Sequence, residues 1–253
     1  MPRHNYWMML VGFLAIASTE GAFAGAIGNQ SQHEIDADQL SWRGLYAGGQ
    51  VGGAWSHQEW QFVNPNYFNT LGSTLLGSNF GFNTSNLLVG GYVGFNYQTA
   101  TPWLVGIEGS ISSEKLDSSK PSPFFPTDQY ASGTNQMGTA RGRLGYIYNR
   151  WLPYVSGGWA FANTSLTLTD SIGNVQALTR PWNSGWIVGV GVDYRWNQTI
   201  AMGIAYDYSD INVKNQSTSC PMCSSGVGFG TPLLNANFKT QAVMARFSYL
   251  INQ

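Results

Sequence analysis

The feature that most restricts the fold of this chain is a two-residue alternation of side-chain character. Between Trp186 and Trp196 every even position is Trp, Val or Tyr, whereas the odd positions are Ile, Gly, Asp or Arg. Segment 200–209 repeats the pattern, with Ile, Met and Tyr on one side and Ala, Gly, Asp and Ser on the other. Successive side chains of a β-strand point to opposite faces, so both segments predict strands with one apolar face.

The same period occurs along most of the chain. The predicted strands are 45–55, 87–97, 103–111, 140–148, 153–161, 186–196, 200–209 and 243–251. Their connections alternate between short (98–102, 149–150, 197–199) and long (near 61–86, 117–135, 169–183, 212–240). Short turns at one end and long loops at the other are typical of outer-membrane barrels. The sequence therefore predicts an all-β fold, an eight-stranded antiparallel up-and-down transmembrane β-barrel.

Composition and the position of the aromatic residues indicate which face meets which solvent. Charged residues make up 10% of the chain, against about 25% in ordinary soluble domains. Small or charged residues facing inward would give a soluble barrel a poor core, so we expect the apolar face to point outward into lipid. Aromatic residues lie at the short-turn ends of this face, where they predict a periplasmic girdle: Tyr97, Trp103, Tyr148, Trp151, Trp196 and Tyr249.

The first residues indicate export. Arg3 and His4 precede an apolar core at 7–17 and the small-x-small sequence Ala22-Phe23-Ala24, which predicts a cleaved signal peptide over 1–24. A membrane anchor is the alternative, but about eleven apolar residues are too few for a spanning helix. We expect a polar arm over 25–41 and the barrel over 42–253, with localisation in the outer membrane and its lipids and lipopolysaccharide as partners.

With the apolar face outward, a set of charges points into the barrel. The predicted lumen charge network comprises Glu108, Arg141, Arg143, Asp193, Arg195, Asp207 and Arg246. Such charges need partners because little water reaches them, and we expect Glu108 to pair with Arg143. One hypothesis is a conduction path or gate. The other, favoured by the narrow interior of eight strands, is a polar plug with inward glycines making room for the arginines.

Other motifs in the sequence give little support for catalysis or for metal or cofactor binding. Cys220 and Cys223 are expected to form a small disulfide ring in an oxidising compartment, with reduced thiols and a redox or metal role as alternatives. No nucleophile elbow, His-Glu-x-x-His motif or phosphate loop occurs, so neither catalysis nor a cofactor or metal is predicted. The net charge of −1 offers no basic field for nucleic acid.

Three stretches resemble the small immunogenic outer-membrane proteins of the OmpA-like eight-stranded β-barrel class. They are 42–49 (WRGLYAGG), 138–158 (from GTARGRLGY to LPYVSGG) and 184–208 (from SGWIVGVGVDY to AYDY). The resemblance implies a porin-family surface barrel with membrane-integrity, antigenic or host-contact roles, and some such proteins are haemin binders or weak porins. It also implies insertion by the outer-membrane assembly machinery, which reads an aromatic last residue, whereas this chain ends Tyr249-Leu-Ile-Asn-Gln253.

These observations favour a non-enzymatic outer-membrane barrel with an envelope-structural, surface-antigen or host-contact role. A host or other extracellular ligand would then be bound through the extracellular loops. The alternative is a narrow pore or a haemin or small-ligand binder. A lipid-modifying or proteolytic barrel would need paired acids or a Ser/His set at one rim, where His57 is the only histidine.

Overall fold

The computed structural model describes residues 41–66, 76–123, 127–169, 175–179, 181–218 and 232–251. The predicted signal peptide, nearly all of the predicted arm, and Cys220 and Cys223 lie outside these residues. The described residues form ten strands: β1 (Gly44–Asn64), β2 (Asn79–Gln98), β3 (Trp103–Ser113), β4 (Ser118–Pro121), β5 (Gln129–Tyr146), β6 (Trp151–Thr169), β7 (Val175–Thr179), β8 (Trp182–Arg195), β9 (Ile200–Ser217) and β10 (Leu233–Ile251).

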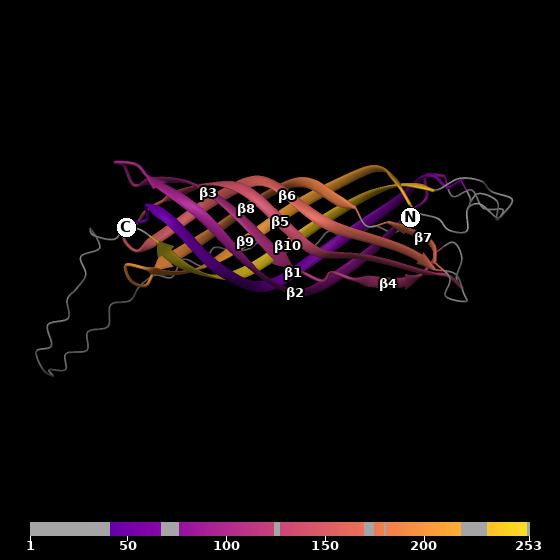
Figure 1. Ribbon diagram of the computed structural model, residues 1–253, viewed down its shortest axis with the longest axis horizontal. Helices are drawn as coiled ribbons and strands as arrows, with labels where there is room; N and C mark the ends of the chain where they lie inside the picture. The colour runs from indigo at the N-terminus through magenta and orange to yellow at the C-terminus, as the bar shows by residue number, and fades with distance from the viewer. Residues whose placement is uncertain are drawn as a thin grey trace, which may run out of the picture. The chain divides into compact units, whose positions relative to one another are not determined.

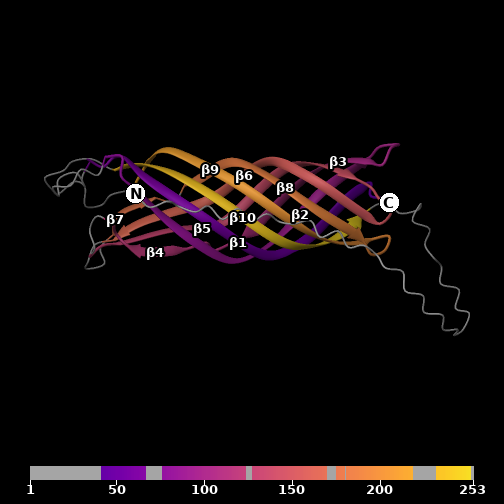
Figure 2. The same cartoon turned by 180° about the vertical axis from the view of Figure 1, so that it is seen from behind.

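Eight of these strands close into an antiparallel ring. The order is β1-β2-β3-β5-β6-β8-β9-β10, and β10 pairs with β1 to close it (Figures 1 and 2). The closing pair is in continuous register from Leu45–Ile251 to Phe62–Leu234. Neighbours in the ring follow one another along the chain, so the predicted eight-stranded up-and-down barrel is confirmed.

β4 and β7 are continuations of ring strands. β4 pairs with β5 beyond the end of β3, and β7 pairs with β6 beyond the start of β8. Lys115, with φ 38°, interrupts β3 before β4, and Pro181, which has no N–H to give to a ladder, stands between β7 and β8. Both continuations lie at the end opposite the end of β10 (Figures 1 and 2), here called the loop end; the other is the turn end.

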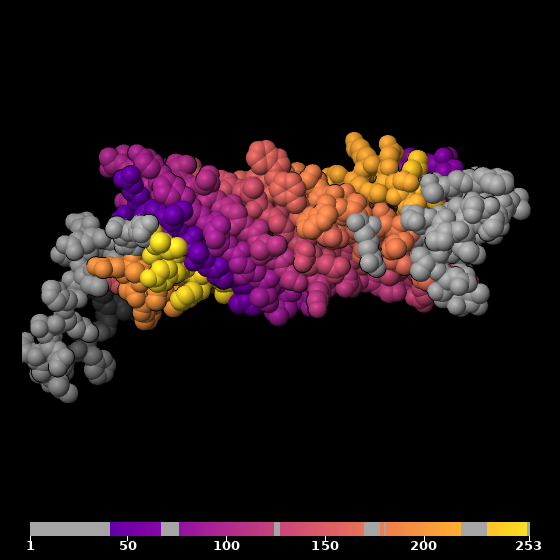
Figure 3. All heavy atoms as spheres, in the orientation of Figure 1, coloured from indigo at the N-terminus to yellow at the C-terminus, as the bar shows by residue number. Residues whose placement is uncertain are grey.

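The outer surface of the turn-end half is an apolar band. Large side chains such as Val93, Ile107 and Ile204 are more than half exposed there, and neighbouring strands form a continuous wall (Figure 3). An outward apolar band on a closed ring is what a bilayer requires of a sheet. Among the described residues, no helix is long and apolar enough to cross a bilayer.

Beyond this band the strands continue toward the loop end with the opposite polarity. On β1, His57, Glu59 and Gln61 point outward while Trp60 and Phe62 are fully buried. The interior core here contains Trp60, Phe62, Phe80, Phe82, Tyr130, Leu166, Leu168, Leu234 and Phe238, among others. We name the polar-walled portion of the ring around this core the loop-end extension.

The expected extents of the long loops are therefore corrected. Much of 61–86, 117–135, 169–183 and 212–240 is strand, including all of β4 and β7. A search for an apolar outward face misses these segments because their apolar side chains point inward. The predicted end of strand 140–148 is corrected too, because β5 ends at Tyr146. Asn149, with φ 54°, makes a tight turn in which Tyr148 forms an isolated bridge to Trp151.

The position of the apolar band can be tested with two lysines. We expect Ile107→Lys, on the band, to lower the free energy of unfolding by about 2–4 kcal/mol because the charge enters lipid. Thr167→Lys, on the outer wall of the loop-end extension, should change it by less than about 0.5 kcal/mol. Urea unfolding in lipid vesicles measures both, and equal costs would contradict the placement of the band.

Candidate functional site

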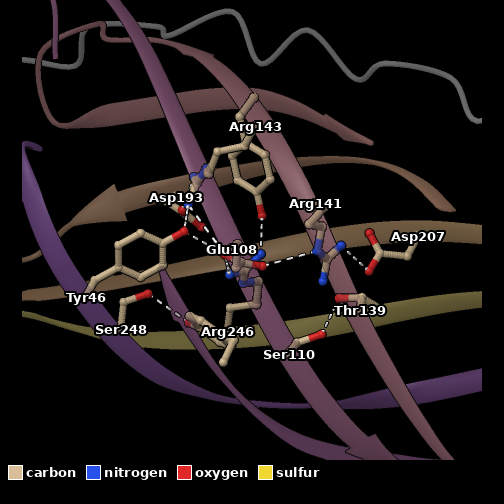
Figure 4. A network of polar contacts seen from close by, with 12 residues as sticks. Tyr46, Glu108, Ser110, Thr139, Arg141, Arg143, Asp193, Asp207, Arg246 and Ser248 are labelled. Carbon is tan, nitrogen blue, oxygen red and sulfur yellow. Dashed lines mark hydrogen bonds and ion pairs between the residues drawn. The ribbon is translucent and has the colours of Figure 1, made fainter. Parts of the chain in front are cut away.

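The lumen beside the apolar band contains the charges singled out from the sequence. Glu108 comes from β3, Arg141 and Arg143 from β5, Asp193 from β8, Asp207 from β9 and Arg246 from β10. All six are nearly fully buried, because each occupies an inward position of the alternation. The ring brings them into one cluster (Figure 4), which we call the lumen network.

Glu108 is the centre of the lumen network. Its Oε2 atom lies 2.5 Å from Arg246 Nη2, and its Oε1 atom lies 3.3 Å from Arg141 Nε. The predicted pair with Arg143 is confirmed, at 3.8 Å between Nη1 and Oε2, but it is the longest of these contacts. One carboxylate therefore joins three arginines from two strands.

Two further carboxylates complete the charge balance. Arg143 Nη2 lies 2.7 Å from Asp193 Oδ2, and Arg141 Nη1 donates to Asp207 Oδ2 at 2.7 Å. Three arginines and three acids thus form one neutral, buried set. A buried charge is tolerable only with such partners, so the lumen network cross-links strands that are not neighbours in the ring.

Tyrosines are the part of the lumen network that sequence analysis missed. Tyr46 donates its hydroxyl to Glu108 Oε2 at 2.8 Å, and Arg246 Nη1 donates to the Tyr154 hydroxyl at 2.8 Å. The guanidinium carbon of Arg143 lies 3.9 Å from the centre of the Tyr154 ring, and that of Arg246 lies 4.1 Å from the Tyr92 ring. The sequence did contain a signal for these tyrosines, because the two-residue alternation of β1, β2 and β6 places all three on the inward face.

Inward glycines make room for these tyrosine rings. A Cβ atom added to Gly191 would lie 2.5 Å from the Tyr154 ring, and one added to Gly48 would lie 2.5 Å from the Tyr92 ring. Neither gap can hold a methyl group. The expectation that glycines make room for arginines needs correction at these sites, because the tyrosine rings lie on the glycines and the guanidinium groups stack on the rings.

Arg195 does not join the lumen network, contrary to expectation. It is the last residue of β8, and its Nε and Nη2 atoms donate to the carbonyls of Asn197 and Gln198 at 3.0 and 2.5 Å. Its guanidinium carbon lies 5.1 Å from the Trp42 ring. At the strand end the side chain reaches the β8–β9 turn, so Arg195 stabilises the turn end.

Apolar layers close the lumen on both sides of the charges. At the turn end the layer contains Trp42, Leu104, Leu152 and Leu250, all nearly or fully buried. At the loop end lies the aromatic core of the extension. In the described part of the chain, no group of three or more His, Cys, Asp or Glu residues is placed to hold a metal ion.

The aromatic residues predicted for the girdle all lie on the outer surface near the turn end. Tyr97, Trp103, Tyr148, Trp151, Trp196 and Tyr249 are each about half exposed or more. The structure adds outward aromatics on the loop-end side of the band, among them Trp55, Trp159 and Trp186. Trp186 packs against Tyr208 at 5.4 Å between ring centres. The sequence search had considered only the turn ends.

Glu114 is a buried carboxyl outside the lumen network. It lies in the connection between β3 and β4, beyond Ile111, the last outward apolar residue of β3. Its Oε1 atom accepts a hydrogen bond from Ser112 Oγ at 3.3 Å. Burial, with a smaller contribution from the charge of Asp207, raises the pKa of Glu114 to about 7.

Comparison with known proteins agrees with this architecture. Residues 18–249 match the sequence profile of the family described as outer membrane protein beta-barrel domain. The 31 kDa outer-membrane immunogenic proteins of Brucella melitensis and Brucella suis are each 24% identical over 243 residues, covering 92% of this chain and 98% of theirs.

Solved structures of outer-membrane barrels are also similar. OprG from Pseudomonas aeruginosa aligns with a TM-score of 0.44 and 13% identity, covering 83% of this chain and 98% of its own. The outer membrane protease OmpT from Escherichia coli aligns with a TM-score of 0.45 and 9% identity, covering 85% and 100%.

Removing the central carboxylate tests the lumen network. Glu108→Gln leaves one buried positive charge uncompensated, so we expect the free energy of unfolding to fall by about 3–5 kcal/mol. Glu59→Gln, on the outer wall, should change it by less than about 0.5 kcal/mol. In urea unfolding, adding Arg246→Gln to Glu108→Gln should cost less than the sum of the single changes. Additive costs would argue against a coupled network.

Glu114 makes stability depend on pH. Because its folded-state pKa is raised, its stabilising contribution is complete below pH 4.5 and is lost as the pH rises to about 7. Glu114→Gln should therefore be more stable than the parent at pH 8, by up to roughly 3 kcal/mol, and similar at pH 4. Urea unfolding at both pH values measures this difference, and a pH-independent difference would contradict it.

Proposed function

Because this chain belongs to the outer membrane protein β-barrel family, we propose that it is a closed, non-enzymatic barrel that presents its loop-end connections at the cell surface. Its place in the outer membrane follows from the family and from its immunogenic relatives. The proposal concerns its role there, an envelope-structural and surface-contact function. In it the turn-end aromatics face the periplasm and the loop end faces the exterior.

The observation that carries this proposal is the reversal of polarity along the strands. In the band, apolar side chains point outward and charges inward; in the loop-end extension, polar side chains point outward and aromatics inward. A sheet section with a polar wall and an apolar core suits water on its outside. It is therefore built to stand above a bilayer.

The length of the loop-end extension supports a display role. On β1, residues 56–64 continue beyond Trp55. For a tilted strand this length corresponds to roughly 20 Å along the barrel axis. Rings such as Trp60 and Phe238, in edge-to-face contact at 5.5 Å between centres, fill its interior. A packed core makes the extension a rigid support for the four connections that begin and end at its rim.

The pore alternative has less support. A conducting lumen needs a continuous aqueous path, whereas apolar layers lie on both sides of the lumen network and its own charges are mutually neutralised. Apart from Trp42, which directly precedes β1, the closing side chains named above belong to strands, so closure does not require the loop-end connections.

The haemin alternative would use a histidine as an axial ligand, and the described part of the chain contains one histidine, His57. His57 points outward, and its Nδ1 atom lies 2.5 Å from Asn83 Oδ1. No histidine among the described residues points into the lumen, and the hydroxyl groups of Tyr46 and Tyr154 are bonded to Glu108 and Arg246, so we rank this alternative behind a surface-contact role. Absence of a Soret shift at stoichiometric haemin would dismiss it.

Planar-bilayer recording tests the closed barrel. We expect no regular single-channel steps from the purified protein, because both apolar layers exclude water and ions. A variant lacking 221–230 should behave identically, since the residues named in both layers lie outside this segment. Regular steps in the parent that disappear in Arg143→Gln would overturn the proposal in favour of a pore.

A further inference from the structure

We propose that one face of the loop-end extension, on β2, β1, β10 and β9, binds lipopolysaccharide through both its phosphate and its sugars. This inference rests on the proposed function, because the face meets the outer leaflet only if the loop end points outward from the cell. The face is defined by the outward side chains Trp55, His57, Glu59, Gln61, Asn79, Asn83, Tyr208, Asp210, Asn212, Lys214, Asn235, Asn237 and Lys239, and its two acids balance its two lysines. We call it the amide face.

The outward side chains change from apolar to polar toward the loop end on neighbouring strands. Along β1 they run from Val51 through Trp55 to His57, Glu59 and Gln61, and along β10 from Val243 through Gln241 to Lys239, Asn237 and Asn235. On β1 the aromatic Trp55 is followed by His57, an acid and a carboxamide, and on β10 a carboxamide is followed by Lys239 and two more carboxamides. We call the level of His57 and Lys239 the cationic level, after Lys239, and the level beyond it the carboxamide level. A phosphorylated glycolipid presents acyl chains, phosphate and sugars in that order from the membrane outward.

The cationic level forms a pocket beside the aromatic border of the band. This pocket has a volume of about 510 Å³ and is lined by Trp55, Tyr208, His57 and Lys239, among others. His57 and Lys239 are direct cross-strand partners. Asp210, which neighbours Lys239 on β9, accepts hydrogen bonds from the amides of Asn212 and Asn237. A lysine next to interfacial aromatics suits an anionic headgroup.

The carboxamide level forms a second, smaller pocket farther from the band. It has a volume of about 190 Å³ and is lined by Glu59, Gln61, Asn79, Asn212, Lys214 and Asn237, among others. One acid and one base leave this set neutral, and each primary amide offers two donors and one acceptor. That combination fits the hydroxyl groups of sugars better than a second phosphate.

A β-bulge shapes the smaller pocket. Between Leu234 and Ala236 the register of β10 against β9 shifts by one residue, so that Lys214 and Asn215 on β9 both stand opposite Asn235. Asn215 takes a left-handed φ of 53° and donates its N–H to Asn235 Oδ1 at 2.9 Å. Bulges redirect side chains from a regular wall, and here the bulge places Lys214 and Asn235 at the pocket.

The opposite side of the loop-end extension has different chemistry. The outward residues of β6 there are Ser165, Thr167 and Thr169, and Ala131 faces outward on the neighbouring β5. Hydroxyl groups predominate on this wall, which also has two outward carboxamides, Gln129 on β5 and Asn163 on β6. Solubility alone would not require this difference between two walls of one barrel, and it supplies matched control positions.

Native mass spectrometry of the full-length protein in detergent tests the phosphate contact. The probes are rough-type lipopolysaccharide, lipid A without core sugars, and phosphatidylglycerol. We expect lipopolysaccharide to bind the parent, and Lys239→Gln to weaken binding about fivefold, the effect of one cation at a membrane surface. Lys115→Gln, which removes an exposed lysine outside the amide face, should leave binding within about twofold. Gel migration with and without boiling confirms that each variant is folded.

The sugar contact requires a second variant. Gln61→Ala combined with Asn79→Ala changes two cross-strand partners that line the smaller pocket and leaves the amides bonded to Asp210 in place. It should weaken lipopolysaccharide binding about fivefold or more through lost hydrogen bonds, while lipid A binding stays within about twofold. Thr167→Ala should change neither.

Equal effects of the two lysine changes, or phosphatidylglycerol binding as tightly as lipopolysaccharide, would overturn the inference. Such a result in a folded barrel that conducts no ions would leave the proposed function standing.

Discussion

Backbone groups within a bilayer have no water to bind, so a sheet there can have no free edge, and the pairing of β1 with β10 meets this requirement. Closure after eight strands leaves an interior that only side chains can fill. The chain fills it with a neutral ionic layer around Glu108, between an apolar layer at the turn end and the aromatic core at the loop end. The closed lumen is thus a consequence of strand number.

On β6 the inward parity is constant from end to end, while the chemistry on each face changes with the surroundings; on β5 a register shift between Thr134 and Gln136 instead exchanges the inward parity. On β6, Tyr154, Ala160 and Leu166 all point inward, yet they belong successively to the lumen network and to the aromatic core. The outward residues change from Val155 and Trp159 to Ser165 and Thr167. A single continuous sheet thereby serves two solvents, lipid around the band and water around the loop-end extension.

The sequence was sufficient to predict the ring, the outward band and the inward position of seven charged residues, because all depend on a two-residue period. It was insufficient where partners are set by three-dimensional neighbours. Apart from their inward parity, nothing in the sequence distinguishes Tyr46 and Tyr154 from other aromatic residues. Their role follows only from the closed ring, which places them next to Glu108 and Arg246. Arg195 shares the parity of Asp193 but lies at a strand end, where turn carbonyls are nearer than any carboxylate. The strand segments of the loop-end extension were not predicted, because the sequence was searched for strands with an apolar outward face.

The stacking of tyrosine rings on inward glycines links positions that are far apart in the chain. Gly191 on β8 has no space for a methyl group while Tyr154 on β6 occupies it. Gly48 on β1 is confined by the Tyr92 ring of β2 and also by the backbone oxygen of Phe247. During evolution, a glycine in such a pair can enlarge only when its tyrosine becomes smaller, and losing the tyrosine removes the surface on which an arginine lies. The trio of Gly191, Tyr154 and Arg143 is therefore expected to vary as a unit among descendants of this fold, leaving its mark as correlated substitutions, whereas Gly48 is held by the backbone as well.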